Sequence, residues 1–243
     1  LRDEYDYTPG TDPDRPIPKG RLGNVPLSEM PPNLMAGSDR EAVLRETYWR
    51  YWIEAGEDAW WNNSKVSVFE GGNYTPFEVW RPQMGCMMRD GSGFCVVCME
   101  TMVKQIYRRV RPIDELTPPA GEILIEPKGE MVFQVLPMQP RTHELEVVWR
   151  LVSLGINKPK EKGEKKTGTS VAETEGEVFR RAAKRTDVDG RAIHGAELRA
   201  KDLDPGWYRL KVEVRDPTRW VIQDPDELLV DRAEWLIQVA GEE

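Results

Sequence analysis

Three cysteines are the clearest candidates for chemistry in this sequence. Cys86, Cys95 and Cys98 fall within one short stretch of a 243-residue chain that has no other cysteine. A Cys-x2-Cys pair is common in zinc knuckles and in thiol redox sites, but a single third thiol completes neither pattern. Because the count is odd, the sequence allows a disulfide plus one free thiol, three reduced thiols, or a metal site completed from elsewhere.

The two histidines do not form a recognisable catalytic zinc motif. Peptide hydrolysis on zinc needs three protein ligands, an open position for water and a carboxylate base, and His-Glu-x-x-His on a helix commonly supplies two of the ligands. That motif does not occur in the printed sequence, where His143 and His194 lie far apart. We expect both to be ordinary surface or strand histidines.

The composition is that of a globular protein without a broad nucleic-acid-binding surface. With 39% hydrophobic residues and nine tryptophans, the chain can bury a substantial core. A formal charge of −8 argues against a surface that follows phosphates. No stretch approaches the roughly 20 apolar residues that span a bilayer. We therefore expect no nucleic-acid partner and no membrane span.

The first half of the chain predicts an extended segment followed by helices. Residues 8–37 carry repeated Pro and Gly, which argue against a long helix or a central strand. Ser38 begins a helical pattern with a capping box, and Gly56 is a plausible end for it. Over 97–110 the apolar residues follow the i, i+3, i+4, i+7 spacing of an amphipathic helix.

The second half predicts a β-sandwich. Beyond Pro118 the apolar period changes from about 3.6 to 2. Roughly seven short strands in this half are typical of an immunoglobulin or fibronectin type of sandwich. The expected strands lie near 122–126, 131–136, 144–149, 192–199, 207–215, 219–222 and 233–239.

Two aromatic residues and one loop refine this expectation. Tyr208 follows a Pro-Gly turn at the start of an alternating strand, so it is either a tyrosine corner or simply part of a strand with a good turn. Trp149 is expected to face the core from an early strand. Residues 155–177 are rich in Lys, Glu, Gly, Thr and Ser and have few large apolar side chains. This composition predicts a mobile surface loop.

Several separated segments of the first half occur in an informative order. They are 1–5 (Leu-Arg-Asp-Glu-Tyr), 48–54 (Tyr-Trp-Arg-Tyr-Trp-Ile-Glu), 68–74 (Val-Phe-Glu-Gly-Gly-Asn-Tyr), 80–82 (Trp-Arg-Pro), 86–89 (Cys-Met-Met-Arg), 94–98 (Phe-Cys-Val-Val-Cys) and Glu100. In order and approximate spacing, residues 1–110 resemble the IgA-peptidase family of metzincin-like zinc peptidases. In that family the zinc helix runs directly into a Gly-Leu-x-Asp-Glu-Tyr segment.

The resemblance implies roles for three residues near the zinc ion. Asp3 is the candidate third zinc ligand and Glu4 is its alternative, because a carboxylate oxygen can complete a His-His-carboxylate set. The structural alternative for Asp3 is an acid at a helix end that makes a cap or a salt bridge. Tyr74 is a candidate oxyanion-stabilising phenol, or else a packing residue.

The resemblance also implies a Met-turn near the cysteines. Met87 or Met88 would lie beneath the zinc ion without binding it, unless both are ordinary core methionines. Arg81 and Arg89 would order the turn by donating to carbonyls or carboxylates, unless they are surface residues. A disulfide that includes Cys86 would connect the turn to the following helix and is the favoured interpretation for an exported enzyme; a thiol metal site is second.

The expected fold class is α+β. Residues 1–117 are expected to be the C-terminal part of a metzincin-like catalytic domain with its Met-turn, and residues 118–243 an immunoglobulin- or fibronectin-like β-sandwich.

The expected function is that of a fragment of a secreted zinc endopeptidase acting on protein or glycoprotein substrates. Its His-Glu-x-x-His helix would lie in an upstream segment or a separate chain. By itself the printed chain is expected to be inactive and to hold no zinc tightly, and the expected location is extracellular or periplasmic. The alternative is a non-catalytic extracellular binding or structural protein that retains a peptidase-like scaffold.

Overall fold

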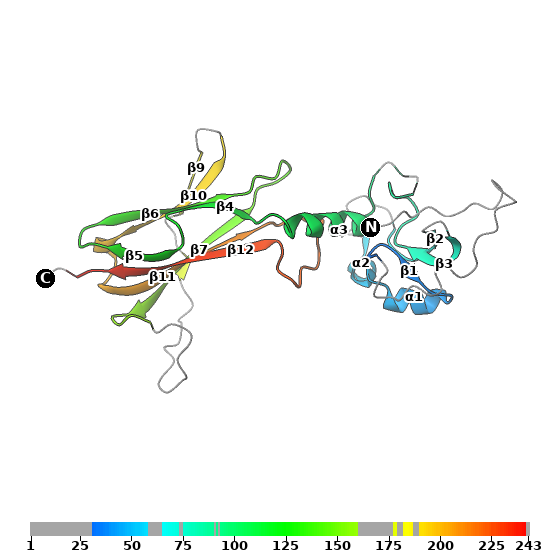
Figure 1. Cartoon of the computed structure of the whole chain (residues 1–243), viewed down its shortest axis with the longest axis horizontal. Helices are drawn as coiled ribbons and strands as arrows, with labels where there is room; N and C mark the ends of the chain where they lie inside the picture. The colour runs from blue at the N-terminus through cyan, green and yellow to red at the C-terminus, as the bar shows by residue number, and fades with distance from the viewer. Residues whose placement is uncertain are drawn as a thin grey trace, which may run out of the picture. The chain divides into compact units, whose positions relative to one another are not determined.

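The chain folds as a mostly β member of the α+β class. The computed structural model describes residues 31–57, 65–72, 75–89, 91, 93–159, 177–178, 182–186 and 190–241 (Figure 1). Two compact units are present, the first formed by 1–109 with 218–225 and the second by 110–217 with 226–243. Within the described part of the chain, no helix has the length and hydrophobicity needed to cross a membrane.

Two short helices replace the single helix expected over residues 38–56. Helix α1, Arg40–Glu46, begins after Asp39, whose side chain accepts from the Glu41 N–H at 2.9 Å. Helix α2, Arg50–Ala55, ends at Gly56 with a φ of 74°. The break lies between them because Trp49 is fully buried and its Nε1 donates to the Ser67 carbonyl at 2.7 Å. This tertiary contact is not visible in the local sequence pattern.

A small antiparallel sheet and a longer helix complete the first unit. The strands are β1, Met35–Ala36, β2, Phe69–Gly72, and β3, Thr75–Arg81, in the order β1-β3-β2. Helix α3, Val96–Tyr107, covers most of the helical stretch expected at 97–110, but it starts one residue earlier and ends three residues sooner. The main core cluster of this unit contains Trp49, Trp52 and all three cysteines.

Two sheets form the second unit. One has the strand order β4-β6-β10-β9, with β4 Ile113–Thr117, β6 Glu130–Pro137, β9 Ala182–Thr186 and β10 Ala192–Arg199. The other has the order β5-β12-β11-β7-β8, with β5 Gly121–Ile125, β7 Glu146–Gly155, β8 Glu177–Val178, β11 Gly206–Arg215 and β12 Val230–Val239. Neighbouring strands pair antiparallel except for β5 and β12, which are parallel.

One hydrophobic core joins the two sheets. Phe133 of β6 packs edge-on against Trp235 of β12, with ring centroids 5.2 Å apart. On its other side Trp235 stacks with Trp149 of β7 at 5.8 Å. All three side chains are at most 2% exposed. Trp149 therefore faces the core, as its strand pattern predicted.

The Tyr208 hydroxyl donates to the Asp204 carbonyl at 2.8 Å. This bond to backbone a few residues upstream, at the start of a strand, is the geometry of a tyrosine corner. Of the two alternatives for Tyr208, the structure therefore has the tyrosine corner and not merely a strand after a turn.

The expected strand at 219–222 was wrong. These residues form a turn and irregular backbone between β11 and β12, and they belong to the first unit. Pro217 and Pro225 lie on either side of the segment, and each lacks the N–H needed for a strand ladder.

The units divide before the position suggested by the sequence. Strand β4 pairs antiparallel with β6, so residues 113–117 belong to the second unit and not to the first.

The predicted loop at 155–177 begins at the last residue of β7, but its residues 160–176 lie outside the described part of the chain. Just before that gap, Lys158 pairs with Glu122 at 2.7 Å and lies over the Trp207 ring.

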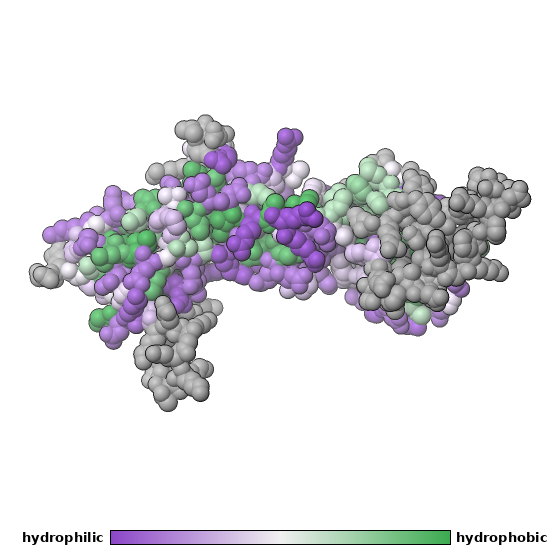
Figure 2. Space-filling view, viewed as in Figure 1, coloured by the Kyte–Doolittle hydropathy of each residue, from purple (hydrophilic) through white to green (hydrophobic). Residues whose placement is uncertain are grey.

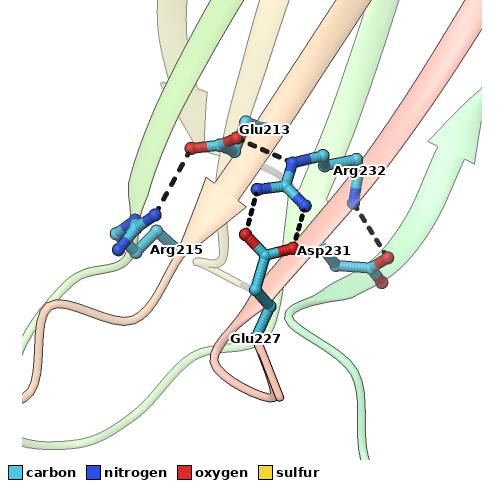
Figure 3. Close-up of polar contacts among 5 residues, drawn as sticks. All are labelled: Glu213, Arg215, Glu227, Asp231 and Arg232. Carbon is cyan, nitrogen blue, oxygen red and sulfur yellow. Dashed lines mark hydrogen bonds and ion pairs between the residues drawn. The ribbon is translucent and has the colours of Figure 1, made fainter. Parts of the chain in front are cut away.

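A charged cluster ties the start of β12 to β11 and to the turn before it (Figure 3). The Arg232 guanidinium donates to both carboxylate oxygens of Glu227, at 2.7 and 3.0 Å, and to Glu213 at 2.8 Å. Arg215 is the fourth member, 3.9 Å from Glu213. Hydrogen bonds and charge from Arg232 lower the pKa of Glu227. These exposed pairs position the turn and form an ordinary solvated surface.

Hydrophobic residues on the visible face of the second unit lie in patches among hydrophilic ones (Figure 2). Exposed apolar side chains of this unit include Leu124, Val132 and Ile156. Scattered apolar residues of this kind are normal on soluble surfaces and do not by themselves indicate a binding site.

Candidate functional site

A tight loop after β3 places the first cysteine. The Cys86 carbonyl accepts from the Arg89 N–H at 2.9 Å and from the Gly91 N–H at 2.8 Å. The Met87 N–H donates to the Gly93 carbonyl at 2.7 Å. These bonds fold the loop back on itself, so that Cys86 meets the start of α3.

The other two cysteines lie at the N-terminus of α3. Cys95 is the N-cap residue, and its sulfur accepts from the Cys98 N–H at 3.4 Å. The Gln83 side chain is fully buried and accepts from the Val96 N–H at 3.1 Å, so it holds the loop against the same helix turn. A spacing of three residues places both thiols on one side of that turn.

The three sulfur atoms form one buried cluster. All three lie within 4.8 Å of one another, and the Cys86 and Cys98 sulfurs are 3.8 Å apart. Each cysteine is 0% exposed. Hydrogen bonds with the Cys95 and Cys98 side chains hold the pKa of the Cys86 thiol far below its usual value, with burial opposing them and the N–H groups of Cys95 and Met88 adding to them.

The favoured disulfide is not what the structure shows. None of the three cysteines forms a disulfide. The Cys86 and Cys98 sulfurs are 3.8 Å apart, well beyond the roughly 2.05 Å of a disulfide bond. The loop is instead held to α3 by hydrogen bonds to sulfur, including the Cys95 N–H to Cys86 at 3.3 Å.

Gly91 permits the close packing of this loop. A Cβ atom at Gly91 would lie 2.9 Å from the Cys86 backbone nitrogen and 3.0 Å from its carbonyl carbon. Backbone atoms cannot move aside as a flexible side chain can, so any larger residue would displace Cys86. At Gly93, two residues later, an added Cβ would meet nothing within 4 Å.

The two candidate support arginines both bind backbone carbonyls. Arg81 is 2% exposed, and its Nη1 donates to the carbonyls of Glu70 and Gly71 on β2. Arg81 is therefore not the surface residue of the alternative interpretation. Arg89 donates to the Met84 carbonyl at 3.3 Å.

The candidate Met-turn residues directly follow Cys86 but differ in environment. Met87 is 48% exposed, whereas Met88 is partly buried against the core cluster that contains the cysteines. The other candidates, Asp3, Glu4 and Tyr74, lie outside the described residues.

Glu100 is a buried acid whose role the sequence pattern did not reveal. It is 2% exposed, and its Oε2 accepts from the Tyr51 hydroxyl and from Trp52 Nε1, the latter at 2.5 Å. Lys104 Nζ lies 3.0 Å from its Oε1. Burial and then the Glu100 carboxylate raise the pKa of Tyr51. A signal was available, since Glu100 shares the i, i+3, i+7 face with Val103 and Tyr107.

The two histidines belong to the second unit, whereas the three cysteines belong to the first. His143 Nε2 is 2.6 Å from Asp216 Oδ1, and its Nδ1 is 2.9 Å from the Thr142 hydroxyl. His194 lies on β10, and both histidines line a surface hollow. In the described parts of the chain, the cysteine cluster is the one group of three or more His, Cys, Asp or Glu side chains close enough to share a metal ion. The described residues therefore do not fit a catalytic His-His-carboxylate zinc ion.

The chain was compared with known protein families and with curated proteins. Neither a scan against protein-family models nor a search of curated proteins finds a match to this chain.

Proposed function

We propose that this chain forms part of a secreted zinc endopeptidase resembling the IgA-peptidase family, with the first unit in the catalytic region and the second as an accessory β-sandwich. The reaction would be hydrolysis of peptide bonds in protein or glycoprotein substrates, outside the cell or in the periplasm.

The observation that carries the proposal is that the segments of the resemblance contact one another through buried polar groups. Arg81 of the Trp-Arg-Pro segment binds the backbone of Glu70 and Gly71. Glu100 accepts from Trp52 of the aromatic helix. These contacts support the proposal because they join segments that carry the resemblance into one packed unit.

The strand order of the second unit supports an immunoglobulin- or fibronectin-like sandwich. In one sheet the neighbouring strands β4, β6, β10 and β9 correspond to strands A, B, E and D of an immunoglobulin sheet. In the other sheet β7, β11 and β12 correspond to strands C, F and G. The buried Trp149 on the C strand and the Tyr208 corner at the start of the F strand fit the same pattern. Such a domain could bind substrate protein or glycan, or stabilise the enzyme.

The proposal gives the described residues no direct part in the hydrolysis of the peptide bond. The resemblance places the zinc ligands at Asp3, or Glu4, and on an upstream helix, with Tyr74 as a candidate oxyanion group. Arg81, Arg89 and the Met87-Met88 pair would support the wall of that site.

The test is to compare chain 1–243 with a version extended upstream along its natural reading frame through a His-Glu-x-x-His helix. We expect chelator-sensitive casein hydrolysis by the extended protein and none by the shorter one. In the extended protein, Asp3→Asn should weaken zinc binding at least about tenfold, whereas Glu4→Gln, the matched control, should do much less.

Two results would count against the enzyme. One is an upstream reading frame without the motif, and the other is an extended protein that carries the motif but cleaves nothing. Either would favour the non-catalytic binding or structural protein.

A further inference from the structure

We propose that Cys86, Cys95 and Cys98 bind one thiophilic metal ion, with zinc as the expected ion, and that this ion clamps the loop after β3 to the N-terminus of α3. The proposal uses only residues of this chain and does not depend on the proposed peptidase activity. It departs from the sequence-based expectation that the chain alone holds no zinc tightly.

The spacing of the sulfur atoms suits a metal ion better than a disulfide. A tetrahedral zinc ion about 2.3 Å from each sulfur holds two thiolates about 3.8 Å apart. The Cys86 and Cys98 sulfurs are separated by 3.8 Å, and Cys95 completes a group whose members all lie within 4.8 Å. One ion can therefore contact all three with small side-chain adjustments.

The backbone around the cluster favours thiolates, the form that binds metals. The Cys86 sulfur accepts a hydrogen bond from the Cys95 N–H at 3.3 Å, and the Cys95 sulfur accepts one from the Cys98 N–H at 3.4 Å. An N–H that donates to sulfur stabilises the anion. The twelve-residue helix α3 also presents the positive end of its dipole at Cys95.

A divalent cation suits the charge that the three cysteines carry when they bind as thiolates. Three buried thiolates would carry a charge of −3, which a 0% exposed site tolerates only with compensation. A divalent zinc ion reduces the charge to −1, and the N–H groups and helix dipole offset the remainder. Soft sulfur ligands select zinc or Cu(I) over magnesium or calcium.

The fourth coordination position is not supplied by the described residues, since no fourth His, Cys, Asp or Glu among them joins the cluster. The proposal therefore assigns three protein ligands and leaves the last position to a small exogenous ligand such as water.

The first experiment measures metal on tag-free chain 1–243 purified under reducing conditions. We expect about one equivalent of zinc. Replacement by Co(II) should produce a thiolate-to-cobalt charge-transfer band in the near ultraviolet, and the strength of the visible bands reports whether the ion is four-coordinate. Titration with a mercurial thiol reagent in the presence of a zinc indicator should release the zinc as the three thiols react.

Variants separate metal binding from packing. Cys98→Ser should lower zinc affinity at least about tenfold, because a direct ligand matters no less than the groups around it. Gly91→Ala keeps all three sulfurs but displaces the Cys86 backbone, so it should also weaken binding. Gly93→Ala is the matched control and should bind zinc like the wild type.

Several results would overturn the proposal. Mass spectrometry of the protein from its natural source that finds a disulfide between two of these cysteines would do so. So would reduced wild-type protein that takes up no zinc and shows no cobalt charge-transfer band. Because the thiol titration uses wild-type protein, it remains decisive if a cysteine variant fails to fold. Loss of peptidase activity in the extended protein would not bear on this site.

Discussion

Replacement of Glu100 should destabilise the first unit far more than replacement of an exposed glutamate on a neighbouring helix. Glu100→Ala leaves the Tyr51 hydroxyl and Trp52 Nε1 without their acceptor in a buried site. Hydrogen bonds to a charged group contribute about 1.5–3 kcal/mol each, and removing one partner of a buried ion pair costs about 3–5 kcal/mol. Lys104 keeps 22% of its side chain exposed and can turn to water, so most of the loss comes from the two ring donors. We expect a loss of about 3–5 kcal/mol.

The matched control is Glu54→Gln. Glu54 pairs with Arg50 on α2 at 2.5 Å, but both side chains are more than half exposed. Such an i, i+4 pair contributes about 0.3–0.5 kcal/mol. The loss of stability in Glu100→Gln should lie between the losses in Glu100→Ala and Glu54→Gln, because an amide oxygen can still accept from one donor.

Hydrogen exchange read by mass spectrometry is the appropriate assay, since the chain has two units and a single unfolding transition cannot be assumed. Protection should fall in α3 of Glu100→Ala, while β11 in the second unit serves as an internal reference. If Glu100→Ala and Glu54→Gln lose equal protection, the buried carboxylate does not hold this unit together.

Three further predictions concern other buried polar groups. Burial and the Glu100 carboxylate raise the pKa of Tyr51 above its ordinary value of 10.0, so the folded state keeps the proton longer and wild-type stability should fall as pH rises above 10. Tyr51→Phe should lack that part of the alkaline loss, and melting curves from pH 8 to about 11 would show it; parallel curves would refute it. Trp235→Phe should cost about 1–2 kcal/mol more than Trp149→Phe, because the Trp235 indole N–H donates to two backbone carbonyls whereas that of Trp149 has no partner among the described residues. Equal urea midpoints would contradict this difference. Tyr208→Phe removes the corner hydrogen bond and should cost about 0.5–1.5 kcal/mol in the same assay, so an unchanged midpoint would show that the corner adds nothing.

The alternation of apolar residues along the second half was sufficient to predict most strands, because side chains alternate between the two faces of a sheet. The same local information predicted the inward-facing Trp149 and left the Tyr208 corner as one of two alternatives, since each depends on a strand and its adjacent turn. The helix near 97–110 was equally predictable from its 3.6-residue period. These features follow from contacts close in sequence.

The tertiary structure alone decided which distant residues meet. The loop bonds that carry Cys86 to Cys95 run between backbone groups, so the sequence left a disulfide, reduced thiols and a metal site all open, and the disulfide favoured from the resemblance is not what the structure has. Glu100 looks like one more helix carboxylate until Tyr51 and Trp52 are seen to donate to it. The break before α2 likewise depends on where the buried Trp49 ring finds its acceptor. Buried polar groups must be satisfied by whichever partner the packing provides, and a linear pattern does not record that partner.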